Sequence, residues 1–564
     1  MKTYTNLLKW MAVAAAALML CACQDFLTRD AENQTTEEAW WYNKSILNTV
    51  VNQCYAPMPG GTLTGSSSVT YARDASQTGN EYYYNCKVEN EGLSDNGVTV
   101  ANYISNSAIT YGTAQSTHTH PTTMWTMRYA TIRRCSRYLE NWHKAIIYPD
   151  TTPWEGIQTV DRWEAEIRAL RAYYHLELFM NFGPIPIVDH VITVGEKDLK
   201  RNTKEEVVKF IADEFELASK NLPVNAQTSE ERWRWTKGAC YAYLSYLYLF
   251  VGDWTNAKYW AEQVIGLNKY DIYVSPTNPA ESYSEQFLQA AYTNNTKESI
   301  LTRDRGMHQA CMRLAPPSIR NGTSGVSPSA ALIDAYELKD GRTLDELTES
   351  ERQHYHLYPT PADRDPRLGM TIVFPGESHA GYTWNPWVAG NTDYIGSRNS
   401  TATGYWVKKW VNQADMSLAS TTSSTLPFQL MRYSVVLLNY VEAAVELNQL
   451  SDPNIYLFLN KIRNRAGMPD VDESKYNTQA SLRELVRRER RIELAFEGHR
   501  LIDIRRWRIA EEVMNGPLYG AKRPDAEELY YVEERRFNPD RDYVWPIPNT
   551  EVQNNSNMEQ NPGY

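Results

Sequence analysis

Residues 235–268 read WTKGACYAYLSYLYLFVGDWTNAKYWAEQVIGLN and contain two helical patterns separated by the turn Gly252-Asp253. Small residues recur beside large ones on one face of each predicted helix: Ala239, Tyr243, Tyr246 and Leu247, then Trp254, Ala257, Ala261 and Val264. Small side chains where two helices cross, with large ones beside them, are typical of tetratricopeptide-like repeats. This stretch therefore predicts a packed helix pair.

The same helical periodicity recurs on both sides of this pair. Helices are expected in roughly 123–147, 160–182, 203–221, 235–251, 253–268, 428–449, 452–466 and 479–497. Most of these segments come in neighbouring pairs, and each pair needs the next one to bury its apolar face. We predict a mainly α fold with four tetratricopeptide-like helix pairs as its scaffold.

Three long insertions interrupt the predicted helices, near 59–122, 270–330 and 376–427. They are rich in Gly, Ser, Thr, Asn and Pro, with aromatic residues set among them. Loops of this length exceed ordinary connections, and long loops on a rigid scaffold often carry binding sites. We therefore expect irregular loops and short strands in these insertions, some capping helices and some holding a ligand.

The composition narrows the class of ligand. The chain of 564 residues has a formal net charge of −11, and an acidic surface repels the phosphates of nucleic acids. It has 38 Tyr and 17 Trp against 12 Phe, so most of its aromatic rings carry a hydroxyl or an N–H group. Such rings suit partly solvated surfaces, including those that bind sugars, although most of them are expected to pack between helices.

The amino terminus has the pattern of a lipoprotein signal peptide. Lys2 and Lys9 precede an apolar run that ends at Leu20, which is too short to span a membrane. Ala22 supplies the small residue that a signal peptidase needs before Cys23. We predict a signal peptide at 1–22, a lipid on Cys23 that anchors the chain, and a single domain at 23–564; an ordinary secreted protein is the alternative.

Cysteine and histidine residues give weak signals. One disulfide, between Cys54 and Cys86, fits the spacing, but a disulfide framework does not. His118 and His120 have the spacing of two ligands along a strand, yet nothing nearby completes a metal site, which favours a solvated loop. We expect no cofactor, and a structural calcium ion is left open.

A charged block at 487–507 places three carboxylates, Glu489, Glu493 and Glu497, on one face of a predicted helix. A glycosidase needs one carboxylic acid that stays protonated at its working pH. Arginine residues crowd this block, and cationic neighbours lower the pKa of a carboxylate. The block therefore favours an ion-pair network, and the chain carries no familiar catalytic motif, so we predict that it is not an enzyme.

Several motifs, in order along the whole mature chain, resemble those of the SusD/RagB family. The motifs are Cys23-Gln24-Asp25-Phe26-Leu27, Leu170-Arg171-Ala172-Tyr173-Tyr174 with Phe182-Gly183-Pro184-Ile185-Pro186, Asp365-Pro366-Arg367, Arg432-Tyr433 with Leu438-Asn439-Tyr440-Val441-Glu442-Ala443, 460–467, 488–500, Asp503, Arg506-Trp507, Trp545-Pro546-Ile547-Pro548 and Gln560-Asn561-Pro562-Gly563-Tyr564. The resemblance implies a non-catalytic, surface-exposed lipoprotein of the outer membrane. It would bind an oligosaccharide or polysaccharide and deliver it to a SusC-like TonB-dependent transporter. The alternatives are a surface glycoside hydrolase of an (α/α) type and an adhesin subunit that does not bind sugar.

The residues that hold the glycan are predicted from the chemistry of sugars. Proteins lay aromatic rings against the C–H face of a sugar and bond its hydroxyls with polar groups. Loop aromatics are therefore the candidates, with Trp384 and Trp387 as the stacking platform on the turn that Pro386 stiffens. The flanking candidates are Tyr83, Tyr394 and His308, with Asp74 accepting hydroxyl bonds. A tryptophan that packs inward and anchors this loop is the competing interpretation.

Overall fold

The computed structural model describes ten ranges of the chain. They are 40–60, 86–100, 107–147, 149–228, 231–288, 297–303, 310–319, 321–379, 381–411 and 426–564. The predicted signal peptide at 1–22 and Cys23 lie outside these ranges. No helix in the described part of the chain is both long enough and apolar enough to cross a membrane.

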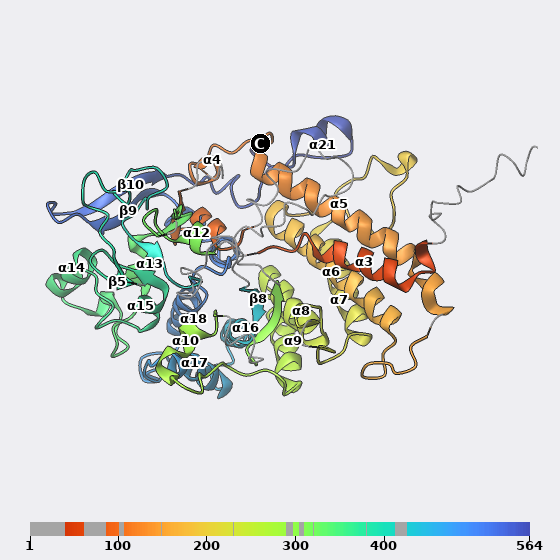
Figure 1. Ribbon diagram of the computed structural model, residues 1–564, viewed down its shortest axis with the longest axis horizontal. Helices are drawn as coiled ribbons and strands as arrows, with labels where there is room; N and C mark the ends of the chain where they lie inside the picture. Colours follow the sequence, from red (N-terminus) through yellow and green to blue (C-terminus); the bar gives the residue numbers. More distant parts are fainter. Residues whose placement is uncertain are drawn as a thin grey trace, which may run out of the picture.

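Long helices packed side by side form the scaffold. Each contacts the next along the series, from the top right of Figure 1 to its lower left. The series is α3 (Lys44–Tyr55), α5 (Thr119–Asn141), α6 (Thr159–Phe182), α7 (Lys204–Lys220), α8 (Lys237–Val251), α9 (Trp254–Gly266), α16 (Tyr433–Glu446), α17 (Asn454–Arg465) and α18 (Gln479–Glu493). The predicted mainly α, SusD-like fold is confirmed, although the sequence analysis missed α3.

Local signals set the ends of these helices. The Thr203 side chain accepts a hydrogen bond from the Glu206 amide, and the Glu206 carboxylate accepts one from the Thr203 amide, so α7 begins with a capping box. Thr236 and Asp253 cap α8 and α9 in the same position. Gly252 ends α8 with a φ of +82°, a left-handed conformation that favours glycine. The predicted turn at Gly252-Asp253 is therefore confirmed.

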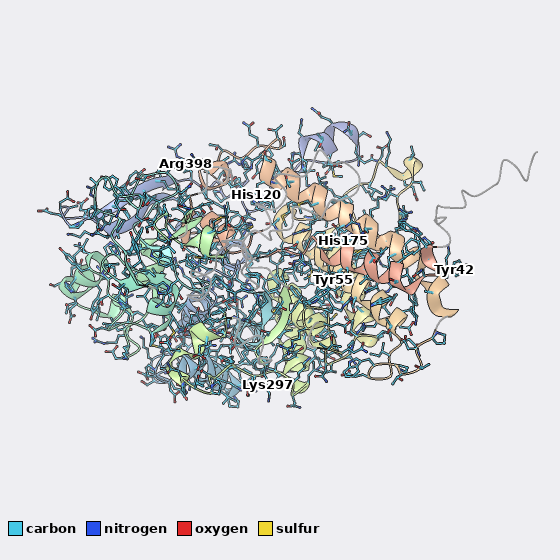
Figure 2. All side chains as sticks on the ribbon, in the orientation of Figure 1. Tyr42, Tyr55, His120, His175, Lys297 and Arg398 are labelled. Carbon is cyan, nitrogen blue, oxygen red and sulfur yellow. The ribbon has the colours of Figure 1, made fainter. Side chains whose placement is uncertain are left out.

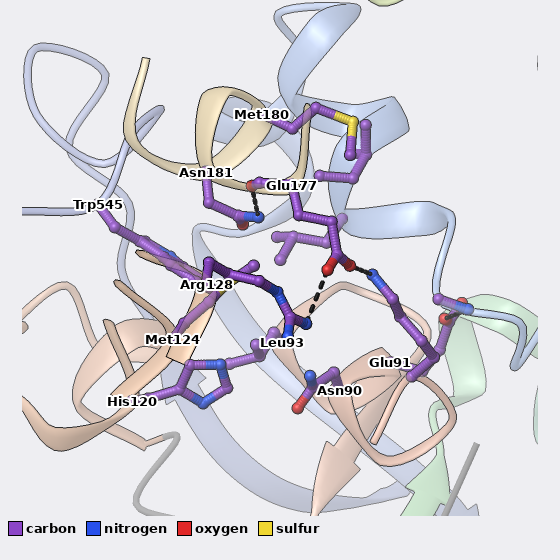
Figure 3. Close-up of a pocket in the computed structure, with 14 residues that line it drawn as sticks. Asn90, Glu91, Leu93, His120, Met124, Arg128, Glu177, Met180, Asn181 and Trp545 are labelled. Carbon is purple, nitrogen blue, oxygen red and sulfur yellow. Dashed lines mark hydrogen bonds and ion pairs between the residues drawn. The ribbon is translucent and has the colours of Figure 1, made fainter. Parts of the chain in front are cut away.

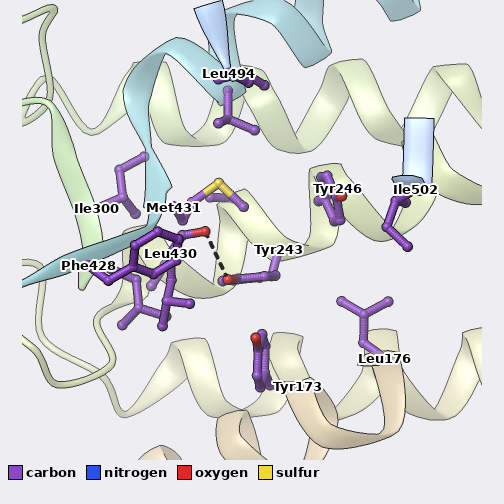
Figure 4. Close-up of a cluster of buried hydrophobic side chains, with 14 of the residues drawn as sticks. Tyr173, Leu176, Tyr243, Tyr246, Ile300, Phe428, Leu430, Met431, Leu494 and Ile502 are labelled. Atoms are coloured by element: carbon purple, nitrogen blue, oxygen red, sulfur yellow. Dashed lines mark hydrogen bonds between the residues drawn. The ribbon is translucent and has the colours of Figure 1, made fainter. Parts of the chain in front are cut away.

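The core between the helices is rich in aromatic rings, as Figure 4 shows for one part of it. Tyr173, Tyr243 and Tyr246 are buried there, and the rings of Tyr173 and Tyr243 meet edge to face at 5.2 Å. The Tyr243 hydroxyl donates to the Leu430 carbonyl at 3.3 Å. Many of the tyrosines therefore serve as buried rings whose hydroxyl finds a partner inside the protein.

Two predicted helix ends are wrong. Residues Phe428–Arg432 form strand β8, which pairs antiparallel with β2 (Ser299–Arg303), and helix α16 begins only at Tyr433. Helix α18 ends at Glu493 rather than at 497, because Phe496 and Gly498 adopt φ angles of +59° and +80°. The chain must turn there to carry Glu497 back toward β8.

The remaining chain forms short elements beside the scaffold, most of them at the left of Figure 1 and α4 and α21 at its top. Four further antiparallel pairs join β1 (Gly97–Thr99) to β3 (Val326–Pro328), β4 (Ile372–Val373) to β7 (Trp406–Val407), β5 (Ser378–His379) to β6 (Tyr382–Thr383), and β9 (Gly516–Lys522) to β10 (Leu529–Arg535). The short helices are α4 (Ser107–Thr110), α10 (Ser282–Glu285), α12 (Ala310–Leu314), α13 (Ala330–Ala335), α14 (Glu349–Leu357), α15 (Arg367–Thr371), α19 (Arg500–Arg506), α20 (Ala510–Val513) and α21 (Asn549–Asn554). The insertions predicted from sequence hold much of this irregular part.

The structure corrects the interpretation of the cysteine and histidine residues. The Cys54 thiol is free and forms a hydrogen bond with the Cys135 thiol on α5. In the described part of the chain, no disulfide joins Cys54 to Cys86. His120 is buried near the start of α5 against the Trp545 ring, and burial lowers its pKa to about 3, so it does not lie in a solvated loop. Within the described ranges, no cluster of three or more His, Cys, Asp or Glu side chains has the arrangement of a metal site.

Candidate functional site

Glu493 at the end of α18 is the centre of a buried ion-pair network. Its carboxylate accepts from Arg367 at 2.9 Å and from Arg432 at 2.7 Å, and it also pairs with Arg465. The next carboxylate, Glu497, pairs with Arg432 at 2.7 Å. The three arginines and Glu497 come from α15, β8, α17 and the turn after α18, so the network joins the scaffold to the irregular part.

The electrostatics of this network exclude the role of a general acid. Burial alone would raise the pKa of Glu493, but Arg465, Arg432 and Arg367 outweigh it and hold the pKa far below its usual range. The pKa of Glu489 is lowered in the same way by Arg367 and Arg463. A carboxylate that stays ionised at every working pH cannot protonate a glycosidic oxygen. The block at 487–507 is therefore structural, as predicted.

An enclosed cavity beside this network is also structural (Figure 3). It has a volume of about 50 Å³, enough for a few water molecules but not for a sugar. Its walls include the Glu177 carboxylate, which pairs with Arg128 at 2.7 Å and with Lys87 at 2.9 Å. Burial raises the pKa of the neighbouring Glu91 to about 7. Buried charges surround this cavity and leave no room for a ligand.

The loop predicted to hold the sugar is anchored by Trp384. Its side chain is only 1% exposed, and its Nε1 donates to the Gly404 carbonyl at 2.8 Å. Its backbone amide and carbonyl pair with Glu377 and Gly376 across the base of the loop. The prediction of an exposed stacking ring at Trp384 is therefore wrong, because this ring fills the core beneath the loop.

Trp387 lies on the outer side of the same turn and stays partly exposed. The Trp387 amide donates to the Asn385 side chain at 3.1 Å, which closes a tight turn after the buried Pro386. The ring packs over Gly404, where an added Cβ would approach it to 3.1 Å. The close approach of the ring and the φ of +84° at Gly404 both favour glycine at this position.

The hairpin of β9 and β10 supplies the other walls around Trp387. The Tyr530 ring lies 6.2 Å from the Trp387 ring, and the Arg523 guanidinium lies 5.9 Å from it. Arg523 also hydrogen-bonds the side chain of Tyr394, which is partly exposed. We call these four residues, Trp387, Tyr394, Arg523 and Tyr530, the Trp387 surface.

Two family models match the chain. A model described as the SusD family matches residues 284–564, and one described as starch-binding associating with outer membrane matches residues 25–249. The chain belongs to the SusD/RagB family. Proteins of this family are carbohydrate-binding proteins associated with the outer membrane, and they are not catalytic. The glycoside hydrolase alternative is therefore excluded.

Individual SusD-like proteins share both sequence and fold with this chain. SusD-like protein P2 of Formosa agariphila is 26% identical over 78% of this chain and 80% of its own length. The crystal structure of a SusD-like carbohydrate binding protein from Bacteroides fragilis superposes with a TM-score of 0.79 and 26% identity, over 92% of this chain and all of that one. Surface glycan-binding protein A from Bacteroides fluxus shares the fold with a TM-score of 0.66 at 17% identity, over 93% of this chain and all of that one.

The remaining predicted site residues fall into two groups. Trp387 and Tyr394 come together in the Trp387 surface, whereas Tyr83, Asp74 and His308 lie outside the described residues. Sequence analysis missed Arg523 and Tyr530 of this SusD-like protein entirely. The run Leu529-Tyr530-Tyr531-Val532, rich in aromatic and β-branched residues, is the signal for a strand near the end of the chain.

Proposed function

We propose that this SusD-like protein captures a glycan on the cell surface at the Trp387 surface and passes it to a SusC-like TonB-dependent transporter. The supporting observation is the partly exposed Trp387 ring, which packs against Gly404 and is flanked by the Tyr530 ring and the Arg523 guanidinium. A ring fixed in this way stacks on a sugar with little loss of conformational entropy.

Polar groups beside the ring can form hydrogen bonds with the hydroxyls of a sugar that stacks on it. Arg523 carries several N–H donors, and the Tyr394 hydroxyl can both donate and accept a hydrogen bond. The guanidinium also forms an ion pair with Asp525 at 3.3 Å, which holds it over the ring. The arrangement therefore suits a sugar with an apolar face and equatorial hydroxyls at its edge.

Two relatives support capture at a membrane surface. One family model describes starch-binding proteins that associate with the outer membrane, and one similar structure is a laminarin-binding SusD-like protein with a TM-score of 0.65. In this chain, a lipid on Cys23 would supply the anchor. Mass spectrometry should find acyl chains on Cys23, and Cys23→Ala should release the protein from membranes; an unmodified, freely secreted chain would contradict the anchor.

The capture itself is tested in two steps. A glycan array identifies the ligand, and an assay for new reducing ends should then show binding without cleavage. Calorimetry with that ligand should show binding weakened at least fivefold in Trp387→Ala, since removing a central anchor ring costs more than about 1 kcal/mol. Trp40→Ala is the matched control, because Trp40 is an exposed tryptophan outside the Trp387 surface. Equal affinity in the two variants would place the site elsewhere.

Delivery to a transporter requires a stable interface. Such interfaces bury about 800 Å² on each partner, and the outer faces of the helical scaffold offer exposed apolar side chains, including Leu217, Tyr259 and Leu457. Gentle detergent extraction at natural expression levels should recover the protein with a large β-barrel partner. Recovery of the protein alone would remove this part of the proposal.

A further inference from the structure

A second concave site lies at the lower edge of the scaffold, away from the Trp387 surface. It is an open groove of about 630 Å³, within the range of pockets that bind small ligands. Its walls are the segment 224–228 after α7, the start of α8, residues 267–270 after α9, and strand β2. Figure 2 labels Lys297 at this edge and Arg398, from the loop that carries Tyr394, at the opposite side of the molecule.

The charge of the groove is opposite to that of the whole protein. Arg232, Lys269 and Lys297 line it, and no Asp or Glu is present among its described lining residues. The chain as a whole carries a formal net charge of −11. Lys269 and Lys297 lie on one concave surface without a carboxylate among its described lining residues, and such a surface attracts an anionic ligand.

The carboxylates nearest to the groove are occupied by other partners. Glu155 accepts from the Val224 amide at 2.8 Å and from the Asn225 amide at 3.1 Å. Asp271 pairs with Lys461, and Glu298 pairs with Arg432 at 2.7 Å and with Arg465. In the described part of the chain, neither Lys269 nor Lys297 forms an ion pair, so their charges remain available to a ligand.

Lys269 is held in place to meet such a ligand. Its ammonium group donates to the Val224 carbonyl and lies 5.2 Å from the centre of the Tyr270 ring. Burial lowers the pKa of Lys269 to about 8, opposed in part by Glu155. A bound anion would restore the electrostatic stabilisation of the ammonium that its burial removes.

The rest of the groove wall fits a sugar. Amide and hydroxyl side chains of Gln227, Thr228, Asn268 and Ser299 line it, and these groups bond sugar hydroxyls. Thr236 caps the 15-residue helix α8 at the groove, so the positive end of that helix dipole adds to the three cations. The groove therefore combines partners for neutral hydroxyls with partners for a negative charge.

We infer that this groove, which we call the basic groove, binds an anionic sugar unit through Arg232, Lys269 and Lys297. The negative group is a carboxylate, as in a uronic acid, or a sulfate ester. This inference rests on the proposed function, because an anionic unit of the captured glycan is the ligand. It adds a second point of attachment, so a charged glycan that reaches both surfaces would bind with greater avidity.

Calorimetry with three small probes tests the inference: trigalacturonate, galactose 6-sulfate and methyl-esterified trigalacturonate. The wild-type protein should bind trigalacturonate, the sulfated sugar or both, and should bind the neutral ester at least tenfold more weakly. The comparison of the two anionic probes identifies the preferred group. Binding should also weaken as salt rises from low to physiological concentration, because the attraction is electrostatic.

Substitutions locate the bound anion. Lys269→Gln should weaken binding of the anionic probe about tenfold, and the more exposed Lys297→Gln about threefold. Lys339→Gln is the matched control, because Lys339 is exposed and lies outside the groove. Because Lys269 also bonds the Val224 carbonyl, thermal unfolding of each variant shows whether the fold is kept, and Lys297→Gln tests the site if Lys269→Gln fails to fold.

Each outcome decides for or against the basic groove. Equal affinity for the anionic and neutral probes, or equal effects of Lys297→Gln and Lys339→Gln, would overturn it. Loss of binding in Trp387→Ala but not in the lysine variants would also overturn it, while supporting the Trp387 surface. Lysine-dependent binding that Trp387→Ala leaves unchanged would support the basic groove even if the Trp387 surface proved wrong.

Discussion

The ion-pair network around Glu493 and the Trp387 surface use charged and aromatic residues in opposite ways. In the network, arginines and carboxylates are buried and pair with one another, so their charges are neutralised inside the protein. In the Trp387 surface, buried groups beneath the loop hold one ring that stays partly exposed. A dense cluster of charges thus marks the scaffold here, and a supported but uncovered ring marks the candidate site.

The largest expected effect is the loss of the centre of the network. Glu493→Ala would leave Arg367, Arg432 and Arg465 without their shared carboxylate, and breaking a buried ion pair costs about 3–5 kcal/mol. Denaturant unfolding should show this loss in the free energy of unfolding. Glu484→Ala is the matched control, since Glu484 lies exposed on the same helix. Equal stability of the two variants would mean that the network does not join the scaffold to the irregular part.

Acid should weaken the same network without any substitution. The folded-state pKa values of Glu489, Glu493 and Asp503 lie below their usual values, because arginine partners outweigh the effect of burial. Their ion pairs therefore stabilise the fold above about pH 4.3, the usual pKa of a glutamate, and this stability is lost as the pH falls toward the folded-state values.

Chemical unfolding measured from pH 7 to pH 3 should show that loss below about pH 4.3. Glu91 acts in the opposite direction, because its pKa is raised to about 7, and its contribution is lost as the pH rises from about 4.3 to that value. Glu91→Gln should therefore remove the pH dependence between about pH 4.3 and 7 and leave the loss of stability at lower pH in place. If the free energy of unfolding of the wild type does not fall below about pH 4.3, the network is not a source of stability.

Two tryptophans three positions apart sharpen the comparison further. Trp384→Ala would remove a buried ring and its bond to the Gly404 carbonyl, and we expect a loss of about 3–5 kcal/mol in the free energy of unfolding. Trp387→Ala should cost about 1 kcal/mol or less, because its ring is only partly buried. Denaturant unfolding of both variants gives the two values, and similar losses would mean that Trp387 also serves as an anchor.

Much of the scaffold could be predicted because its signals are local. The apolar periodicity of residues 160–182 and the glycine and prolines that follow gave nearly the bounds of α6. The strand at Phe428–Arg432 could not be separated from α16 in this way, since an apolar run before an apolar helix reads as one segment. Its partner, Ser299–Arg303, is far away in the sequence.

The candidate site is built from residues that are far apart in the sequence, so it was harder to predict than the scaffold. The sequence around Trp384 and Trp387 does not show which of the two rings is buried. In the structure, Trp384 donates a hydrogen bond to the Gly404 carbonyl and is buried, whereas Trp387 packs against Gly404 from the outer side. Arg523 and Tyr530 reach Trp387 from a hairpin near the end of the chain. Residue types predicted the kind of chemistry, but only the fold shows which of those side chains meet.

The smallest expected effect concerns the polar edge of the Trp387 surface. Arg523 lies 5.9 Å from the Trp387 ring, and its side chain is 35% exposed. A hydrogen bond from Arg523 to a sugar hydroxyl at this exposed edge would contribute about 0.5–1 kcal/mol, so Arg523→Gln should weaken glycan binding about two- to fivefold.

Calorimetry with the glycan from the array measures this change, and the free energy of unfolding should stay within about 0.5 kcal/mol of the wild type. Arg352→Gln, an exposed arginine on α14, is the control for the lost charge. A larger effect for Arg523→Gln than for Trp387→Ala would reverse the roles within the surface. The guanidinium would then be the centre of recognition, and the ring would serve to hold it in place.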